Sequence, residues 1–89
     1  MTRTRSTYRV HFLKSLPLYF EEVATGRKDF EVRRGDRPFA YRDLVVLREW
    51  DSKKGYTGRE LVREIGDVPL RMDDAGMPGY VSFPIRRLE

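Results

Sequence analysis

The sequence has no cysteine and only one histidine, His11, among its 89 residues. Disulfide bonds, thiol catalysis and cysteine-ligated metal sites are therefore excluded, and a conventional zinc site is not expected. Long apolar runs are also missing, since the longest, Leu44–Leu47, is far too short to cross a bilayer. The first seven residues lack the apolar core of a signal peptide. We therefore expect a cytoplasmic protein without membrane association, metal or cofactor.

The short chain leaves room for only one domain. Apolar residues make up only 39% of the sequence, but five Tyr, five Phe and one Trp are enough to build a compact core. Charged residues make up 36%, which implies a strongly solvated surface. We expect a monomer with a single domain over residues 8–89, preceded by a disordered basic arm over residues 1–7.

The net charge of +4 is unevenly distributed. Residues 1–14 contain four basic residues and no acid, and residues 27–42 contain six basic residues against three acids. A localised positive surface suits a polyanion, because each neutralised phosphate releases condensed counterions. The charge alone is equally compatible with a basic face that serves only solubility.

The order of apolar and polar residues predicts one helix within a series of strands. Alternation over residues 8–14 predicts a half-buried strand with Val10 and Phe12 on its apolar face. Pro17 suits the first turn of a helix, and Gly26 suits its end. Further strands are expected over residues 29–34, 43–51, 59–68 and 79–86, with a hairpin loop over residues 52–58.

Two details of these strands follow from single residues. In the second strand, Phe30 and Val32 are expected to point inward, and Glu31 and Arg33 outward. Pro84 has no backbone donor, so the last strand is expected at a sheet edge or on a bulge. Five strands with one helix after the first strand predict a small α+β domain, built as a mixed or closed barrel.

A charged segment at the end of the predicted helix carries the clearest motif. Gly26, Lys28, Glu31 and Arg33 have the spacing G-x-K-x-x-E-x-R, which resembles the signature of the ASCH superfamily. Further segments are similar to a small phage and bacterial subfamily of ASCH-like domains: His11-Phe12-Leu13-Lys14, Pro17-Leu18-Tyr19-Phe20, Asp36-Arg37, Glu49-Trp50-Asp51, Tyr56-Thr57-Gly58-Arg59 and Gly79-Tyr80-Val81. The resemblance covers about residues 8–86.

The resemblance implies a PUA-like β-barrel of about five strands, with a cleft that is lined by the signature residues and holds RNA. One position departs from the pattern of the subfamily. Arg42-Asp43 stands where Gly-Asp is usual before the third strand.

The candidate nucleic-acid-binding residues are Lys14, Lys28, Glu31, Arg33, Arg37 and Tyr56. Glu31 and Arg33 lie two residues apart on one strand, so they share a face at a spacing of about 7 Å. Lys28 and Arg33 would bind phosphates, and Glu31 would accept from a base amino group or orient the two cations. The structural alternative is a surface ion pair of little energetic value.

Three classes of function remain open. The first is a nucleic-acid-binding module whose partner is single-stranded RNA. The second is a metal-independent ribonuclease that uses Lys28, Glu31 and Arg33. The third is an adaptor whose basic face meets an acidic protein. Some ASCH-like proteins are acetylcytidine amidohydrolases with a nucleophilic threonine, but Glu31 occupies that position here, so this activity is not expected.

The lone histidine, His11, is expected to be a hydrogen-bonded structural group. Trp50 is expected in the core, and Tyr56 is expected to be exposed in its hairpin.

Overall fold

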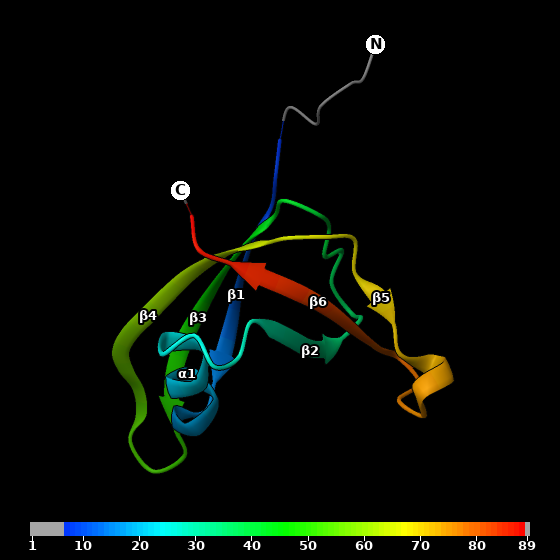
Figure 1. The fold of residues 1–89 in the computed structure, drawn as a ribbon. Coiled ribbons are helices and arrows are strands. Elements are labelled where there is room, and N and C mark those ends of the chain that lie inside the picture. The colour runs from blue at the N-terminus through cyan, green and yellow to red at the C-terminus, as the bar shows by residue number, and fades with distance from the viewer. Residues whose placement is uncertain (1–6, 89) are drawn as a thin grey trace.

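Six strands and one α-helix make up the fold of residues 7–88, the part of the chain that the computed structural model describes (Figure 1). In chain order the elements are β1 (Val10–Ser15), α1 (Pro17–Ala24), β2 (Phe30–Arg34), β3 (Leu44–Asp51), β4 (Gly55–Ile65), β5 (Leu70–Arg71), a single 3₁₀ turn over Asp73–Ala75, and β6 (Tyr80–Arg86). Of the predicted basic arm over residues 1–7, residues 1–6 lie outside the described part. Within residues 7–88, no helix is long and apolar enough to span a membrane.

The strands form one mixed sheet in the order β1-β3-β4-β6-β2, and β5 pairs with β6. β1 and β3 are parallel, with Val10 opposite Leu44, and the other pairs are antiparallel. β1 and β2 are the two edges, so the sheet is not closed and the expected barrel is wrong. The α+β class and the helix after the first strand are confirmed. The sixth strand, β5, lies between the strands expected over residues 59–68 and 79–86, where the sequence predicts no strand.

In a closed barrel, β1 would form backbone hydrogen bonds with β2. Here, carbonyl oxygens of β1 accept hydrogen bonds from arginine side chains instead. Arg33 on β2 donates from Nη1 to the carbonyl oxygen of Lys14, and Arg37 donates from Nη1 to that of Phe12, each over 2.9 Å. A guanidinium reaches several ångströms beyond its own backbone, whereas a ladder requires strands about 4.8 Å apart. These two arginines therefore hold the edges near each other without closing the sheet.

The core lies between the sheet and α1. Phe20 and Val23 of the helix are buried against β-strand residues that include Leu47, Ile65 and Phe83. Pro17 begins the helix as predicted, and Gly26 follows its end with φ +82°, a conformation that glycine adopts without a Cβ clash. The helix therefore closes one side of the core just before the chain enters β2 (Figure 1).

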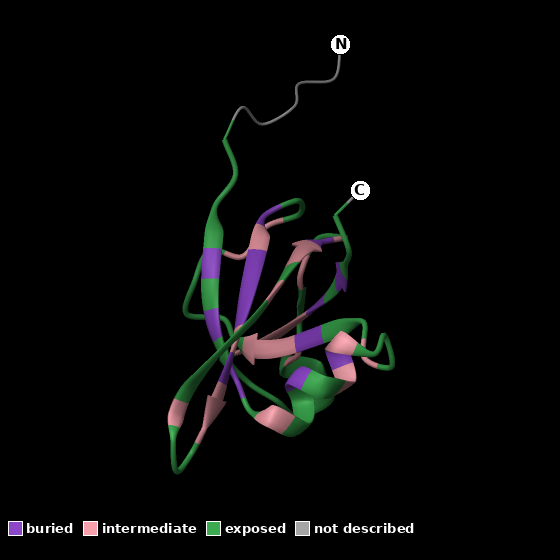
Figure 2. Ribbon diagram, turned by 90° about the vertical axis from the view of Figure 1, so that its left-hand side faces the viewer, coloured by how far each residue is buried: buried purple, intermediate pink, exposed green. Residues whose placement is uncertain are grey.

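Two strands turn the opposite face to the interior from the one predicted. Along β1, His11, Leu13 and Ser15 are buried, and Val10 and Phe12 are exposed (Figure 2). The alternation was read correctly, but the inward face was not. His11 bonds through Nε2 to Asp43 over 2.9 Å, and this buried partner, far away in sequence, makes a polar residue suitable for the interior.

The same reversal occurs in β2, where Glu31 is buried and Phe30 is exposed. Alternation of apolar and charged residues predicts that a glutamate faces solvent, because burial of an unpaired charge is costly. Here the carboxylate is paired, as described below, so the sequence rule that predicted an outward Glu31 does not apply.

Pro84 lies in a strand that has partners on both sides, so its predicted place at an edge or on a bulge is wrong. Phe30 of β2 is opposite Pro84, and on the other side the carbonyl oxygen of Pro84 accepts from Gly66 N over 2.9 Å. β4 ends at Ile65 and β5 begins at Leu70. The nitrogen of Pro84 therefore faces the gap between these two strands, where no ladder donor is needed.

Arg42, at the position where the subfamily usually has glycine, has a left-handed backbone with φ +75°. Its amide donates to Ile65 O over 2.8 Å, and Asp43 next to it accepts from the amides of Arg9 and Ala40. These bonds fix the turn whatever side chain stands at residue 42. The left-handed conformation costs a residue with a Cβ about 1–2 kcal/mol, which glycine would avoid.

Candidate functional site

A cavity of about 400 Å³ lies where the end of β1, the start of α1 and the edge strand β2 meet. Its lining residues are Lys14, Ser15, Leu16, Tyr19, Lys28, Glu31, Val32 and Arg33. The three signature residues with charged side chains, Lys28, Glu31 and Arg33, all line this cavity. We call it the Glu31 cavity.

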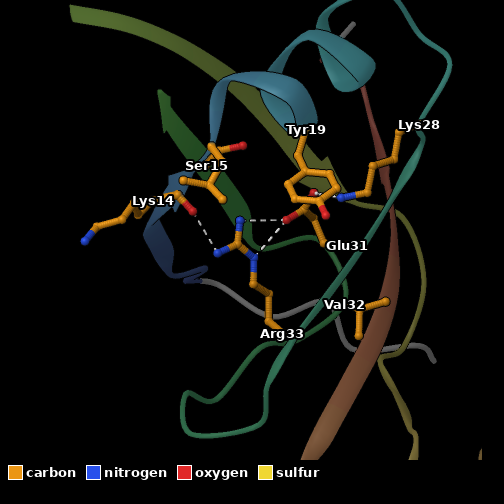
Figure 3. A pocket seen from close by; sticks show the side chains of 8 residues that line it. Lys14, Ser15, Tyr19, Lys28, Glu31, Val32 and Arg33 are labelled. Atoms are coloured by element: carbon orange, nitrogen blue, oxygen red, sulfur yellow. Dashed lines mark hydrogen bonds and ion pairs between the residues drawn. The ribbon is translucent and has the colours of Figure 1, made fainter. Parts of the chain in front are cut away.

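The Glu31 carboxylate is the centre of the site (Figure 3). Only 2% of this residue is exposed, and each of its oxygens meets a different cation. Lys28 Nζ is 3.0 Å from Oε2, and Arg33 Nε and Nη2 are each 2.8 Å from Oε1. The three side chains therefore form one hydrogen-bonded group, and this arrangement holds both cations at the cavity wall.

The two cations remain partly accessible. The exposed fractions of the Lys28 and Arg33 side chains are 21% and 26%. An ammonium has three donors, of which Lys28 uses one on Glu31. A guanidinium has five, of which Arg33 uses two on Glu31 and one on the carbonyl of Lys14. Within residues 7–88, Glu31 is the only acid among the lining residues, against the three cations Lys14, Lys28 and Arg33, so the cavity keeps an excess positive charge and spare donors.

Tyr19 adds an aromatic wall that sequence reasoning missed. It lies on α1, lines the Glu31 cavity, and is 52% exposed. Lys28 Nζ is 5.3 Å from the centre of its ring, within the range of a cation–π contact. The sequence analysis assigned no role to Tyr19. Only the tertiary structure reveals that this ring lies beside the signature residues.

Lys14 lies at the same cavity, but its ammonium has another partner. Its carbonyl oxygen holds Arg33, and its side chain extends away from Glu31 (Figure 3). Nζ is 4.1 Å from the centre of the Trp50 ring. Trp50 was expected in the core and is instead half-buried at the surface, with this lysine over its face.

Arg37 and Tyr56 are not in the Glu31 cavity. Arg37 lines an adjoining hollow of about 240 Å³ that shares Arg33 with it, and Arg37 also bonds to the carbonyl of Phe12. Tyr56 is exposed in the β3–β4 hairpin, as predicted, with the Arg48 guanidinium 4.2 Å from its ring centre. The structure thus brings together Lys28, Glu31 and Arg33, places Arg37 beside them, and leaves Tyr56 apart.

His11 is a buried structural group, as the sequence analysis expected. Its ring bonds to Asp43 and stacks at a tilt on Phe39, with ring centres 4.6 Å apart. Across residues 7–88, no three His, Asp or Glu side chains are grouped as metal ligands.

Comparison with known proteins supports a relationship with a phage protein. A family model described as "Domain of unknown function (DUF3850)" matches residues 10–84. The chain is also 35% identical over 60 residues to "Uncharacterized 12.9 kDa protein in GpA 3'region" of Escherichia phage P2. That alignment covers 67% of this chain and 54% of the phage protein, so the chain matches only about half of its relative's length. Because the family model covers most of the chain, including the whole Glu31 cavity, the protein belongs to the DUF3850 family.

Proposed function

We propose that this domain binds nucleic acid, with single-stranded RNA as its ligand, and that the Glu31 cavity is the binding site. Lys28 and Arg33 bind phosphate oxygens, and Glu31 orients the two cations. Tyr19 offers a face on which an unpaired base stacks. Arg37, in the adjoining hollow, extends the positive wall along the strand.

The observation that carries this proposal is the buried carboxylate of Glu31, which lies between the partly exposed cations of Lys28 and Arg33. An ion in the interior loses several kcal/mol of hydration, and well-packed apolar residues in place of such a group are often as stabilising or more so. A buried charged group is therefore poor evidence for a stabilising role. Two oriented cations with spare donors at a cavity wall are what phosphate recognition requires.

The geometry favours binding over cleavage of RNA. A general base needs a lone pair that can reach the substrate proton. Glu31 is buried, and both of its oxygens already accept from Lys28 and Arg33. This arrangement engages both carboxylate oxygens without presenting them to a ribose hydroxyl, so the ribonuclease hypothesis ranks behind binding.

We also propose that the DUF3850 family is a branch of the ASCH superfamily. The support is the G-x-K-x-x-E-x-R spacing itself, together with the observation that Lys28, Glu31 and Arg33 line a single cavity beside the helix in this protein. A solved structure of an ASCH domain whose signature residues lie on a different face of the sheet would contradict this relationship.

The test is a fluorescence anisotropy titration with single-stranded RNA, single-stranded DNA and double-stranded RNA at two salt concentrations. For RNA we expect log affinity to fall linearly with log salt, with a slope of about −0.7 for each phosphate neutralised. Lys28→Ala should reduce the magnitude of that slope by about 0.7. Tyr19→Ala should weaken binding by about 1–3 kcal/mol at either salt concentration, because stacking is not electrostatic.

Each variant has a matched control. Arg71→Ala removes one positive charge from an exposed arginine paired with Asp73, outside the Glu31 cavity. Leu18→Ala truncates an exposed residue of α1 next to Tyr19 that does not line the cavity. Affinity that is independent of salt, or controls that weaken binding as much as the cavity variants, would refute the proposed site.

A further inference from the structure

A second cavity, of about 420 Å³, lies at the other end of β1 from the Glu31 cavity. It is lined by Arg42, Glu64, Arg86, Arg87 and Leu88. The sheet register places Glu64 next to Leu44 and Arg86, and Leu44 next to Val10, the first residue of β1. The Glu31 cavity is at Ser15, the last residue of β1. Five residues of strand, roughly 16 Å, separate these two ends.

Three arginines line this second cavity, and Glu64 is the only acid among its lining residues within 7–88. Glu64 accepts from Arg86 Nε over 2.8 Å and from Arg42 Nε over 3.4 Å. Arg87 raises the positive charge further. Burial lowers the pKa of the neighbouring Arg63, and the charge of Arg87 lowers it in addition. Three arginines against one acid among the described lining residues therefore leave an excess of positive charge at this end of the sheet.

The backbone of Arg42 points to the same conclusion. The turn demands a left-handed residue, and arginine adopts that conformation only with strain. The Arg42 side chain forms an ion pair with Glu64 over 3.4 Å. A partly exposed ion pair of this kind contributes little to the stability of the fold. Arg42 also lies over the Tyr8 ring, with its guanidinium 5.7 Å from the ring centre. An anion in the cavity would add a charge-assisted bond, which is stronger than either of these exposed contacts.

We propose that Arg42, Arg86 and Arg87 bind a phosphate group in this second cavity. The phosphate comes either from a small phosphorylated molecule or from a nucleic-acid strand. The two cavities lie roughly 16 Å apart along the strands and at least about 10 Å apart across them, because Glu64 is on β4, two strands from β1. A stacked strand of at least about six nucleotides would therefore be needed to span them. Phosphate binding here does not depend on the proposed function of the Glu31 cavity; only the nucleic-acid source does.

The first experiment titrates inorganic phosphate into the isotope-labelled protein and follows the arginine Nε–H signals by NMR. We expect the Arg42, Arg86 and Arg87 signals to shift together with one affinity. Arg87→Ala and Arg42→Gly should each weaken that affinity about tenfold, the loss of one charge-assisted bond. Arg71→Ala, with the same change of charge elsewhere, should leave it unchanged.

Arg42→Gly is the decisive variant because glycine also suits the left-handed turn. We expect its thermal midpoint to be at least as high as that of the wild type while its affinity for phosphate falls. An arginine with only a structural role would not give weaker binding in a protein that is equally stable. No phosphate shift at the three arginines, or equal affinity in Arg42→Gly, would overturn the proposal.

The second experiment identifies the source of the phosphate. If the source is nucleic acid, the salt slope for an RNA of eight nucleotides should decrease in Arg87→Ala, but the slope for an RNA of three nucleotides should not. If only inorganic phosphate responds to Arg87→Ala, a small phosphorylated molecule is the ligand. Lys28→Ala should leave phosphate binding at the three arginines intact in both cases, so failure of the Glu31 cavity as an RNA site is distinguishable from failure of this one.

Discussion

The Arg33 side chain reaches from one edge of the sheet to the other, where its Nη1 donates to the carbonyl oxygen of Lys14 over 2.9 Å. The same guanidinium bonds to the buried carboxylate of Glu31. Arg33 thus connects the gap between β1 and β2 to the charged centre of the cavity. The open edges of the sheet are therefore part of the site, because the cavity lies where the backbone ladder is missing.

Replacement of Glu31 by glutamine should destabilise the fold. The amide keeps the shape of the side chain but leaves Lys28 and Arg33 together without a counter-charge. Loss of one partner of a buried pair costs about 3–5 kcal/mol, and partial solvation of both cations should reduce this to about 1–3 kcal/mol. Urea denaturation at pH 7 measures the change in unfolding free energy.

The control for this variant is Glu60→Gln, which removes an exposed acid paired with Arg48 over 3.1 Å. Its effect should be below about 1 kcal/mol, as for other surface ion pairs. Equal small effects of the two substitutions would mean that the Glu31 group does not act as a buried pair.

Replacement of Arg42 by glycine should stabilise the protein relative to Arg42→Ala. Alanine removes the ion pair with Glu64 but keeps a Cβ in the left-handed region, whereas glycine removes both. We expect Arg42→Gly to be more stable than Arg42→Ala by about 1 kcal/mol, measured by thermal or urea unfolding. A less stable glycine variant would show that the turn does not strain residue 42.

The contribution of Glu64 should depend on pH. The hydrogen bond from Arg86 is the main cause that holds the pKa of Glu64 below its ordinary value of 4.5, and Arg42 lowers the pKa further. A depressed carboxyl pKa stabilises the folded state above the unfolded pKa, and this stabilisation is lost as pH falls through the folded pKa. The stability difference between the wild type and Glu64→Gln should therefore be present at pH 7 and disappear well below pH 4.5. A difference that persists unchanged at acid pH would contradict this linkage.

The protein should not deacylate acetylcytidine. The residue three positions after Lys28 is Glu31, which is buried and paired and has no hydroxyl to attack an amide. Release of acetate at pH 7, followed by chromatography, should not exceed the rate with the Lys28→Ala variant prepared in the same way. Turnover above that background would contradict this prediction and would assign a catalytic role to Glu31.

Local sequence pattern was sufficient for most of the secondary structure. Pro17 and Gly26 delimit α1, and period-two alternation located β1, β2, β3 and β6 to within one or two residues. β4 begins four residues earlier than expected, because the predicted hairpin loop is mostly strand. The two-residue strand β5 has no local signal, since it exists only through its pairing with β6.

The candidate site was only partly predictable. Lys28, Glu31 and Arg33 are two to five residues apart, on β2 or just before it, so their proximity follows from local chain geometry. Tyr19, from the helix, and the carbonyl of Lys14, from the opposite edge, join them through contacts distant in sequence. No period within one segment reports such contacts.

The amino-acid order thus determined the approximate positions of the helix and of every strand except β5, the α+β class of the fold, and which three charged residues share a neighbourhood. These features depend on neighbours in the chain. Tertiary structure alone decided that the sheet stays open, that Glu31 and His11 face inward, and that Arg42 accepts a left-handed turn. Each of these depends on a partner from another element, because a buried charge or a strained backbone is stable only when distant groups satisfy it.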